Sequence, residues 1–404
     1  MLARDFIGDR LYHPQGGYFC NPDVQVGQLK APIDFKSLLG YEDYQKALVE
    51  NYPKNAWLTP CEIFKPYYGM SIGNYIHQLY TYLQQTKKIK QKNIKIIEVG
   101  AGTGTAASNI LFFLKNYESA YYQNIQYNIL DISPQMCEET KNKLSLEHKR
   151  LINNGQIRII NEDFYKYNDF SKNDLYFIIF LEVFDNMPHD RVFYNEKEKK
   201  FDTCAAVELN LDFPNDNLQE VKLPINDRVI QQVLKLYQEL PQMDEIQDKK
   251  LGGGIIQKVL QYYYKQDQKN VFLPTFSYKV LEHIHQNIPN HHLIVADFDL
   301  LRNSESALQG INAPIVSKKG AKSHEKQDYK DYLVKRGEAD IFFPTDFRLL
   351  QSMYKEVTGK KSTIFKSKEF MQEFSKKEWT ETKSGYNPLL EDFTNTSFFV
   401  TQQD

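Results

Sequence analysis

The stretch KIIEVGAGTGTAASNIL, Lys95 to Leu111, decides the fold. A run of isoleucines leads into Glu98, glycines alternate at Gly100, Gly102 and Gly104, and a helical pattern of small residues follows. Glycine adopts backbone conformations that other residues avoid, so its repeated use marks a tight turn. The stretch therefore predicts a strand, a turn and a helix in direct succession.

Three further apolar runs are typical of strands, and each leads to an acid. They are Ile125–Ser133, Ile157–Phe164 and Asp174–Pro188. A charged helical stretch separates the first two, opening on Pro134 and closing on Gly155. Alternating strands and helices predict an α/β fold with a doubly wound parallel sheet. Ligands of such sheets bind at the carboxyl ends of the strands, where these acids fall.

The domain layout follows from the same pattern. We expect an N-terminal helical segment over residues 1–90 that packs on a core domain over residues 91–404. An insertion is expected around residues 191–270, starting with a hairpin at Val192–Leu209 and interrupted by the glycines of Leu251–Gly254.

The last third of the chain continues the alternation. His292–Asp299 is expected to form a strand, Asn303–Gln327 a polar loop, and Gly337–Gly359 a strand followed by an amphipathic helix.

Composition restricts the class of protein. The 404 residues are 41% hydrophobic and 25% charged, with a formal net charge of -2, which is typical of a globular protein. Without a basic excess we expect no nucleic-acid partner. The longest apolar run, Leu175–Leu181, is far shorter than the roughly 20 residues of a membrane helix. The four cysteines lie far apart, so we expect reduced thiols and no metal site.

The glycine turn itself indicates which cofactor it holds. A dinucleotide turn needs G-x-G-x-x-G, but Thr105 stands where the third glycine should be. An acid followed by G-x-G-x-G is instead the pattern of proteins that bind S-adenosyl-L-methionine. Glu98 is expected to meet the ammonium of this cofactor, Asp131 its ribose hydroxyls, and Asp163 its adenine ring.

Several longer motifs resemble one protein family. They are LARDFIGDRLYHPQGGYF, TPCEIFKPYYG, IIEVGAGTGT, LDISPQM, LEVFDNMPHD, LPTFSYKVLEHI, DFDLL, INAPIVSKKG and GEADIFFPTDF, which together span most of the chain. In this order and context they resemble the MidA-like family, also known as the protein arginine methyltransferases of the mitochondrial complex I assembly type. Of these, GEADIFFPTDF and FDNMPHD are more specific than the glycine turn.

The resemblance implies more than the pattern of elements does. It implies a class I (Rossmann-like) fold that uses S-adenosyl-L-methionine, a mitochondrial location, and methylation of an arginine on a core subunit of complex I. The amino terminus has neither the apolar core of a signal peptide nor the acid-poor composition of a mitochondrial presequence. The sequence leaves open whether the chain forms a homodimer.

Two departures from the family pattern bear on turnover. Where the family has an aspartate-containing GDFxTAPE element, this chain has NAWLTPCE, which keeps Thr59, Pro60 and Glu62 in altered order. Where the family has Asn before the Glu of NExxDxLP, this chain has Leu181. A polar contact near the transferred methyl group is therefore expected to be missing.

Glu182 and Asp185 are the candidate catalytic residues, because carboxylates can orient a guanidinium and disperse its charge. In a helical turn they would share a face, and in an extended segment they would point apart. The alternative is that they only cap a loop and a turn.

Other acids and histidines are weaker candidates. We interpret Asp340 and Asp346 as turn or cap carboxylates beside a buried strand. His189 is a candidate proton acceptor near the site, and the histidines between His283 and His292 are interpreted as surface or hydrogen-bonded residues.

Three functions remain open at this point. The first is an active arginine methyltransferase. The second is an accessory subunit of a mitochondrial respiratory complex that keeps the fold without turnover. The third is a nicotinamide-dependent oxidoreductase, which the missing third glycine disfavours.

Overall fold

The structure is a computed structural model. It describes residues 1–21, 25–53, 56–86, 88–208, 218–241, 270–301, 310–319 and 326–402. The glycine break predicted at Leu251–Gly254 lies outside the described residues.

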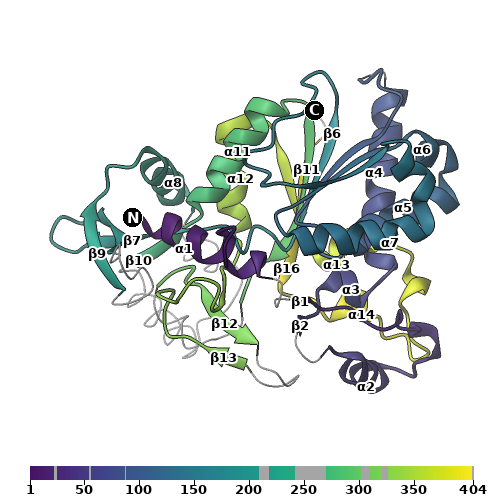
Figure 1. Cartoon of the computed structure of the whole chain (residues 1–404), viewed down its shortest axis with the longest axis horizontal. Helices are drawn as coiled ribbons and strands as arrows, with labels where there is room; N and C mark the ends of the chain where they lie inside the picture. The colour runs from purple at the N-terminus through teal and green to yellow at the C-terminus, as the bar shows by residue number, and fades with distance from the viewer. Residues whose placement is uncertain are drawn as a thin grey trace.

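A seven-stranded sheet forms the centre of the molecule (Figure 1). Its strands are β3 (Lys95–Val99), β4 (Gln126–Asp131), β5 (Ile157–Asn161), β6 (Tyr176–Leu181), β11 (His291–Phe298), β15 (Ser362–Lys366) and β16 (Thr396–Thr401). Their spatial order is β15-β16-β11-β6-β3-β4-β5. The five strands from β11 to β5 are parallel, whereas β16 runs antiparallel to both of its neighbours. The doubly wound sheet expected from the alternating pattern is confirmed.

Both faces of this sheet are buried, which explains why its strands are nearly continuous apolar runs. In β6, Phe177 and Ile179 pack into one core cluster, and Ile178 and Phe180 pack into the other. Successive side chains of a strand point to opposite faces, so a single strand supplies both cores.

Helices cover each face (Figure 1). On one side lie α4 (Tyr67–Gln85), α5 (Thr105–Tyr117), α6 (Ser119–Asn124), α7 (Pro134–Asn153) and α13 (Ser367–Phe374). On the other side lie α8 (Arg228–Glu239), α11 (Thr275–Asn287) and α12 (Phe347–Thr358). The helix expected between Pro134 and Gly155 is α7, with the side chain of Ser133 accepting a hydrogen bond at its start. Within the described ranges, no helix combines the length and apolar character of a membrane span.

Two smaller sheets lie beside the central one. An antiparallel sheet of order β10-β7-β8-β9 contains β7 (Asp190–Asn195), β8 (Lys200–Glu208), β9 (Gln219–Pro224) and β10 (Asn270–Leu273). Strands β7 and β8 form the expected hairpin. A second sheet of order β13-β12-β14 contains β12 (Ile315–Lys319), β13 (Lys326–Asp328) and β14 (Asp340–Phe342). The interpretation of Asn303–Gln327 as a loop is therefore wrong for β12, because its backbone pairs with both β13 and β14.

The N-terminal helix α1 (Ala3–Tyr12) packs on these smaller sheets. Its apolar residues share a core with β8, β12 and β14. The buried guanidinium of Arg4 bonds the carboxylates of Asp190 at 2.7 Å and Asp227 at 2.6 Å.

The remaining N-terminal elements are short apart from α2. They are η1 (Tyr18–Cys20), β1 (Gln25–Val26), η2 (Phe35–Ser37), α2 (Tyr41–Asn51), β2 (Ala56–Trp57) and α3 (Pro60–Ile63). The division of the chain at residue 90 stays a prediction. Pro60 is the first residue of α3.

Candidate active site

The glycine turn connects β3 to α5, as the sequence predicts. Gly100, Gly102 and Gly104 have φ angles of +69°, +53° and +73°, which lie in the left-handed region that favours glycine. A Cβ atom on Gly100 would lie 2.8 Å from Val183, and one on Gly104 would lie 2.8 Å from Thr140. The turn therefore tolerates no side chain at its two ends. A Cβ on Gly102 would meet only Val26, at 3.6 Å.

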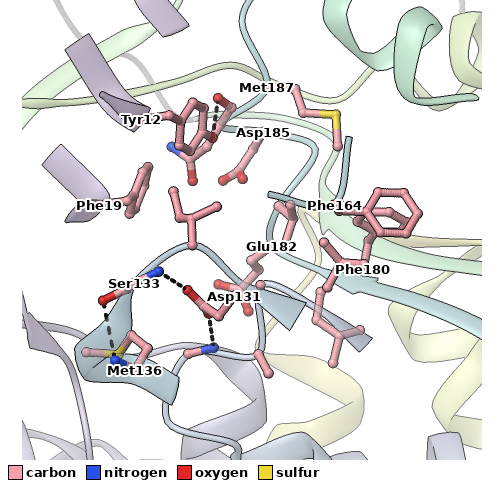
Figure 2. A pocket seen from close by; sticks show the side chains of 18 of the residues that line it. Tyr12, Phe19, Asp131, Ser133, Met136, Phe164, Phe180, Glu182, Asp185 and Met187 are labelled. Carbon is pink, nitrogen blue, oxygen red and sulfur yellow. Dashed lines mark hydrogen bonds between the residues drawn. The ribbon is translucent and has the colours of Figure 1, made fainter. Parts of the chain in front are cut away.

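A cavity of about 1140 Å³ opens at the carboxyl edge of the parallel strands. The glycine turn forms one wall, and the N-terminal segment crosses the opposite side with Tyr12 and Phe19 (Figure 2). Of the expected cofactor residues, Glu98, Gly100, Gly102, Asp131 and Asp163 line this cavity.

Gly104 is the exception among the expected cofactor residues, because it is not part of the cavity lining. It precedes the first residue of α5, with the site of its missing side chain directed at Thr140. We therefore interpret Gly104 as a requirement of the turn and not as a direct ligand contact.

Glu98 lies buried at the base of the cavity. Its Oε2 accepts a hydrogen bond of 2.6 Å from the hydroxyl of Tyr127 on β4. Burial raises the pKa of Glu98 to about 7, against the opposing effect of this hydrogen bond. A cationic group in the cavity would favour the ionised form of this carboxylate.

Asp131 ends β4 and ties the turn to the next loop. It accepts hydrogen bonds from the backbone N–H groups of Gly102 at 3.1 Å and Ser133 at 2.9 Å. Burial raises its pKa to about 6, and these backbone bonds limit the rise. Figure 2 shows both bonds, with Asp131 on the cavity wall next to the glycine turn.

Asp163 lies two residues beyond β5, and so not within the strand itself. Its side chain is 40% exposed, accepts the backbone N–H of Tyr165 at 3.0 Å, and lies 3.8 Å from the ammonium of Lys166. It therefore lies on the rim of the cavity.

Glu182 and Asp185 belong to an irregular turn that follows β6. The turn is neither helical nor extended, and Glu182 takes a left-handed φ of +54°, which is uncommon for a residue other than glycine. The backbone N–H of Asp185 donates to Asp297 Oδ2 at 2.9 Å, which fixes the turn against the end of β11. Both candidate carboxylates line the cavity (Figure 2).

The electrostatics of this turn are unusual. Burial, and then the neighbouring Asp297, raise the pKa of Glu182 to about 8. Burial raises the pKa of Asp185 well above its usual value, with Asp297, Asp340 and Glu182 adding to the rise. Asp185 is only 5% exposed, and its Oδ1 has no hydrogen-bond partner among the described residues.

Asp340 also lines the cavity, which its interpretation as a turn or cap carboxylate did not include. Its Oδ1 accepts a hydrogen bond of 2.8 Å from the side chain of Asn186, in the turn that follows β6. Burial raises its pKa to about 7. Asp346, in contrast, caps α12 as expected, by accepting the backbone N–H groups of Arg348 and Leu349.

Asp297 and Tyr12 were also missed as parts of the site. Asp297 is buried, with a pKa raised to about 7, and its carboxylate holds the backbone N–H of Asp185. Tyr12 donates its hydroxyl to the carbonyl oxygen of Asn186 at 2.9 Å. A Tyr in the N-terminal motif and an Asp at a strand end were the signals available, but neither indicated which residues they would contact.

His189, His283 and His291 do not line the cavity, whereas His13 of the N-terminal segment does. His189 is buried, stacks on Phe343 with ring centroids 3.9 Å apart, and has a pKa lowered to about 3 by burial. It is therefore neutral and does not line the cavity, which excludes it as a proton acceptor there. His283 contacts the carbonyl oxygen of Tyr167 and His291 contacts that of Ile288, as expected of hydrogen-bonded histidines.

The altered NAWLTPCE element is still connected to the glycine turn. Glu62 is buried, accepts the backbone N–H of Leu29 at 2.8 Å and the hydroxyl of Thr105 at 2.8 Å, and pairs with Lys65. It thus joins the segment that crosses the cavity to the first residue of α5. Leu181 lines the cavity next to Glu182.

A sheet of this order, with a glycine turn after β3 and acids at the ends of the neighbouring strands, defines a class I methyltransferase architecture. The model of a family described as "Putative S-adenosyl-L-methionine-dependent methyltransferase" matches residues 71–366. This chain belongs to that family, and S-adenosyl-L-methionine is its cofactor.

Two crystal structures from Burkholderia thailandensis have a similar fold. One, solved with bound S-adenosyl-homocysteine, has a TM-score of 0.61 and 12% identity, and the match covers 100% of this chain and 88% of that chain. The other has a TM-score of 0.56 and 11% identity, and the match covers 100% and 87% of the two chains.

One curated relative also matches. It is the mitochondrial "Protein arginine methyltransferase NDUFAF7 homolog" of Saccharomyces cerevisiae, which is 27% identical over 138 residues. The match covers 33% of this chain, and it spans only about a third (34%) of the yeast protein.

The residues present fit this cofactor. Glu98 offers a buried carboxylate for an ammonium, and Asp131 offers acceptors for hydroxyl groups. A side chain at position 102 would extend toward Val26 at the cavity wall, and because Gly102 has none, this space stays open. Thr105 occupies the place of the third glycine of a dinucleotide turn, and its hydroxyl donates a hydrogen bond to Glu62. The family assignment sets the alternative of a nicotinamide-dependent oxidoreductase aside.

Proposed function

We propose that this methyltransferase acts on an arginine side chain of a protein, as a mitochondrial factor that modifies a core subunit of respiratory complex I. Glu182 and Asp185 are proposed as the catalytic residues. The cofactor contacts are proposed for Glu98, Gly100, Gly102, Asp131 and Asp163, with Gly104 needed for the turn.

One observation carries the arginine assignment. Three carboxyl groups, those of the buried Asp185 and the half-buried Glu182 and Asp340, line the cavity on the side of the glycine turn where the fourth parallel strand ends. No lysine or arginine forms an ion pair with any of them within the described ranges. Buried carboxylates are normally paired, so this arrangement favours a substrate that brings its own positive charge.

The chemistry requires such carboxylates. When bound, S-adenosyl-L-methionine supplies a sulfonium methyl group. Transfer to arginine forms an N–C bond, breaks an S–C bond, and releases one proton from the attacking nitrogen. Arginine stays protonated at neutral pH, so the site has to orient the guanidinium and then accept that proton. Glu182 and Asp185 suit both tasks, because burial raises the pKa of Glu182 to about 8 and the pKa of Asp185 well above its usual value, which makes each carboxylate a better proton acceptor.

The location and partner rest on weaker support. The yeast relative is a mitochondrial protein by name, and its similarity to this chain is limited to about a third of either protein. The motif GEADIFFPTDF resembles the same family. Both observations support a mitochondrial substrate.

The test is a transfer assay with the full chain and methyl-labelled S-adenosyl-L-methionine. The acceptor is a mitochondrial extract from cells that lack this protein, in which the site is unmodified. We expect label in methylarginine of a complex I subunit, and loss of labelling with Glu182→Gln. Label in methyllysine, or in small molecules only, would contradict the arginine assignment.

A second candidate is an accessory subunit without turnover. The observation that favours it is Leu181, which places an aliphatic side chain in the cavity where the related family has Asn. Stoichiometric copurification with a respiratory complex, together with no transfer to any protein, would select this candidate.

A further inference from the structure

Asp340 reaches the cavity from outside the central sheet. It begins β14, which among the described strands pairs with β12 alone, in the three-stranded sheet. Two contacts hold this strand against the turn after β6 that contains Glu182 and Asp185. The backbone N–H of Phe343 donates to the carbonyl oxygen of Asp185 at 2.7 Å, and Asn186 Nδ2 contacts the carbonyl oxygen of Ile341 at 3.2 Å.

The carboxylate of Asp340 is held in a fixed orientation. Asn186 Nδ2 donates to its Oδ1 at 2.8 Å, and the carbonyl oxygen of Asn186 in turn accepts the hydroxyl of Tyr12 at 2.9 Å. Asn186 directly follows Asp185 in the chain. The turn after β6 thus positions two carboxylates. Asp185 is part of the turn, and Asn186 holds Asp340 through its side-chain amide.

The three carboxyl groups leave acceptor capacity on the cavity side. Asp185 Oδ1 is buried without a partner, and no hydrogen bond to the side chain of Glu182 occurs within the described residues. Figure 2 shows the side chains of Glu182 and Asp185 on the same wall, with Tyr12 beside Asp185. A buried oxygen without a partner requires an explanation, and at a cavity a ligand that donates hydrogen bonds provides one.

The shape of the ligand follows from the number of acceptors. A guanidinium is planar and carries five N–H donors in a rigid fork, whereas an ammonium offers three donors on one point charge. Carboxylates supplied by two different sheets can engage different edges of one guanidinium plane.

We propose that Asp340 is the third carboxylate of the substrate site and, with Glu182 and Asp185, binds the guanidinium group of the arginine to be methylated. This inference rests on the proposed function and adds a substrate-binding role for the three-stranded sheet. Asp297 is not part of this set, because it lies behind the turn and bonds the backbone N–H of Asp185.

The test uses a ligand that reaches from the glycine turn to the three carboxyl groups. The probe is an S-adenosylhomocysteine analogue with a guanidinoethyl group attached at the position of the sulfur. The atom at this position is either sulfur or a nitrogen that replaces it. The matched control ligand carries a neutral urea in place of the guanidinium. Calorimetric titration of the full chain gives the ratio of the two dissociation constants, which measures recognition of the guanidinium apart from binding of the nucleoside.

For the unmodified protein we expect the guanidinium ligand to bind about 30-fold more tightly than the urea ligand, a difference of about 2 kcal/mol. Asp340→Asn keeps the shape of the side chain and should lower this ratio about tenfold, with the urea ligand unaffected. Asp346→Asn is the control variant, because Asn caps a helix as well as Asp and this residue lies at the start of α12.

Each outcome has a distinct meaning. An unchanged ratio in Asp340→Asn would overturn the role of Asp340 but leave the arginine assignment standing. Equal binding of the two ligands by the unmodified protein would overturn the proposed function itself. If Asp340→Asn does not fold, Asn186→Ala tests the same inference, because it removes the hydrogen bond that orients Asp340 and should lower the ratio about threefold.

Discussion

The substitution Gly102→Val tests the cofactor site at the glycine turn. Gly102 has a φ of +53°, and its N–H donates to Asp131 Oδ2 at 3.1 Å. A Cβ atom at this position would lie 3.6 Å from a methyl group of Val26, which is ordinary contact. The two additional methyl groups of valine would extend beyond it, toward Val26 or into the cavity.

Two effects of this substitution can be separated. A left-handed backbone costs a residue with a side chain roughly 1–2 kcal/mol, and this cost falls on folding. Displacement of the turn also weakens the charge-assisted bond to Asp131 and the neighbouring ligand contacts. Hydrogen bonds to charged groups contribute about 1.5–3 kcal/mol each. We therefore expect the affinity for S-adenosylhomocysteine to fall about 10- to 150-fold.

The assay is calorimetric titration with S-adenosylhomocysteine, combined with thermal unfolding without ligand. Gly155→Val is a matched control, because Gly155 has a φ of +69° and no atoms near the site of a Cβ, at the end of α7. Both variants should lose similar thermal stability, and only Gly102→Val should lose affinity. If Gly102→Val bound within twofold of the unmodified protein, the glycine turn would not be the cofactor site.

Two further predictions concern pH and stability. Since burial raises the pKa of Glu98 to about 7 and a ligand ammonium needs the ionised carboxylate, affinity for S-adenosylhomocysteine should fall as pH drops from about 8 to 6, by up to about tenfold per unit below 7. Titrations with Glu98→Gln should show weaker binding without this dependence, and a flat profile for the unmodified protein would argue against the contact. Arg4→Met leaves the fully buried Asp190 without its ion pair and should cost about 3–5 kcal/mol in denaturant unfolding. The exposed Arg228, paired with Glu282, is the control, and Arg228→Met should cost less than about 1 kcal/mol; equal losses would contradict the importance of burial.

The parallel sheet and the glycine turn could be predicted because their signals are local. Apolar runs, helix starts and alternating glycines each depend on neighbours within one turn or strand. The acids at or just after the ends of β3, β4 and β5 were identified for the same reason, since the ends of parallel strands meet at one edge. Gly104 was expected to contact the cofactor, because the motif does not reveal which of its glycines face the cavity.

The acidic end of the cavity could not be predicted in the same way. Asp340 follows Asp185 by more than a hundred residues, and the packing of β14 on the turn after β6 brings them together. The left-handed backbone of Glu182 also lacks a sequence signal, because glycine is the usual residue there.

The order of residues along the chain was thus enough to predict the α/β class and to place most of the expected cofactor residues at the cavity beside the glycine turn. The arrangement of Tyr12, Asp185, Asn186 and Asp340 around one cavity depended on contacts between segments that are distant in the chain. Local preferences determine strands and turns, whereas the burial that leaves Asp185 Oδ1 without a partner among the described residues exists only after the sheets have packed together.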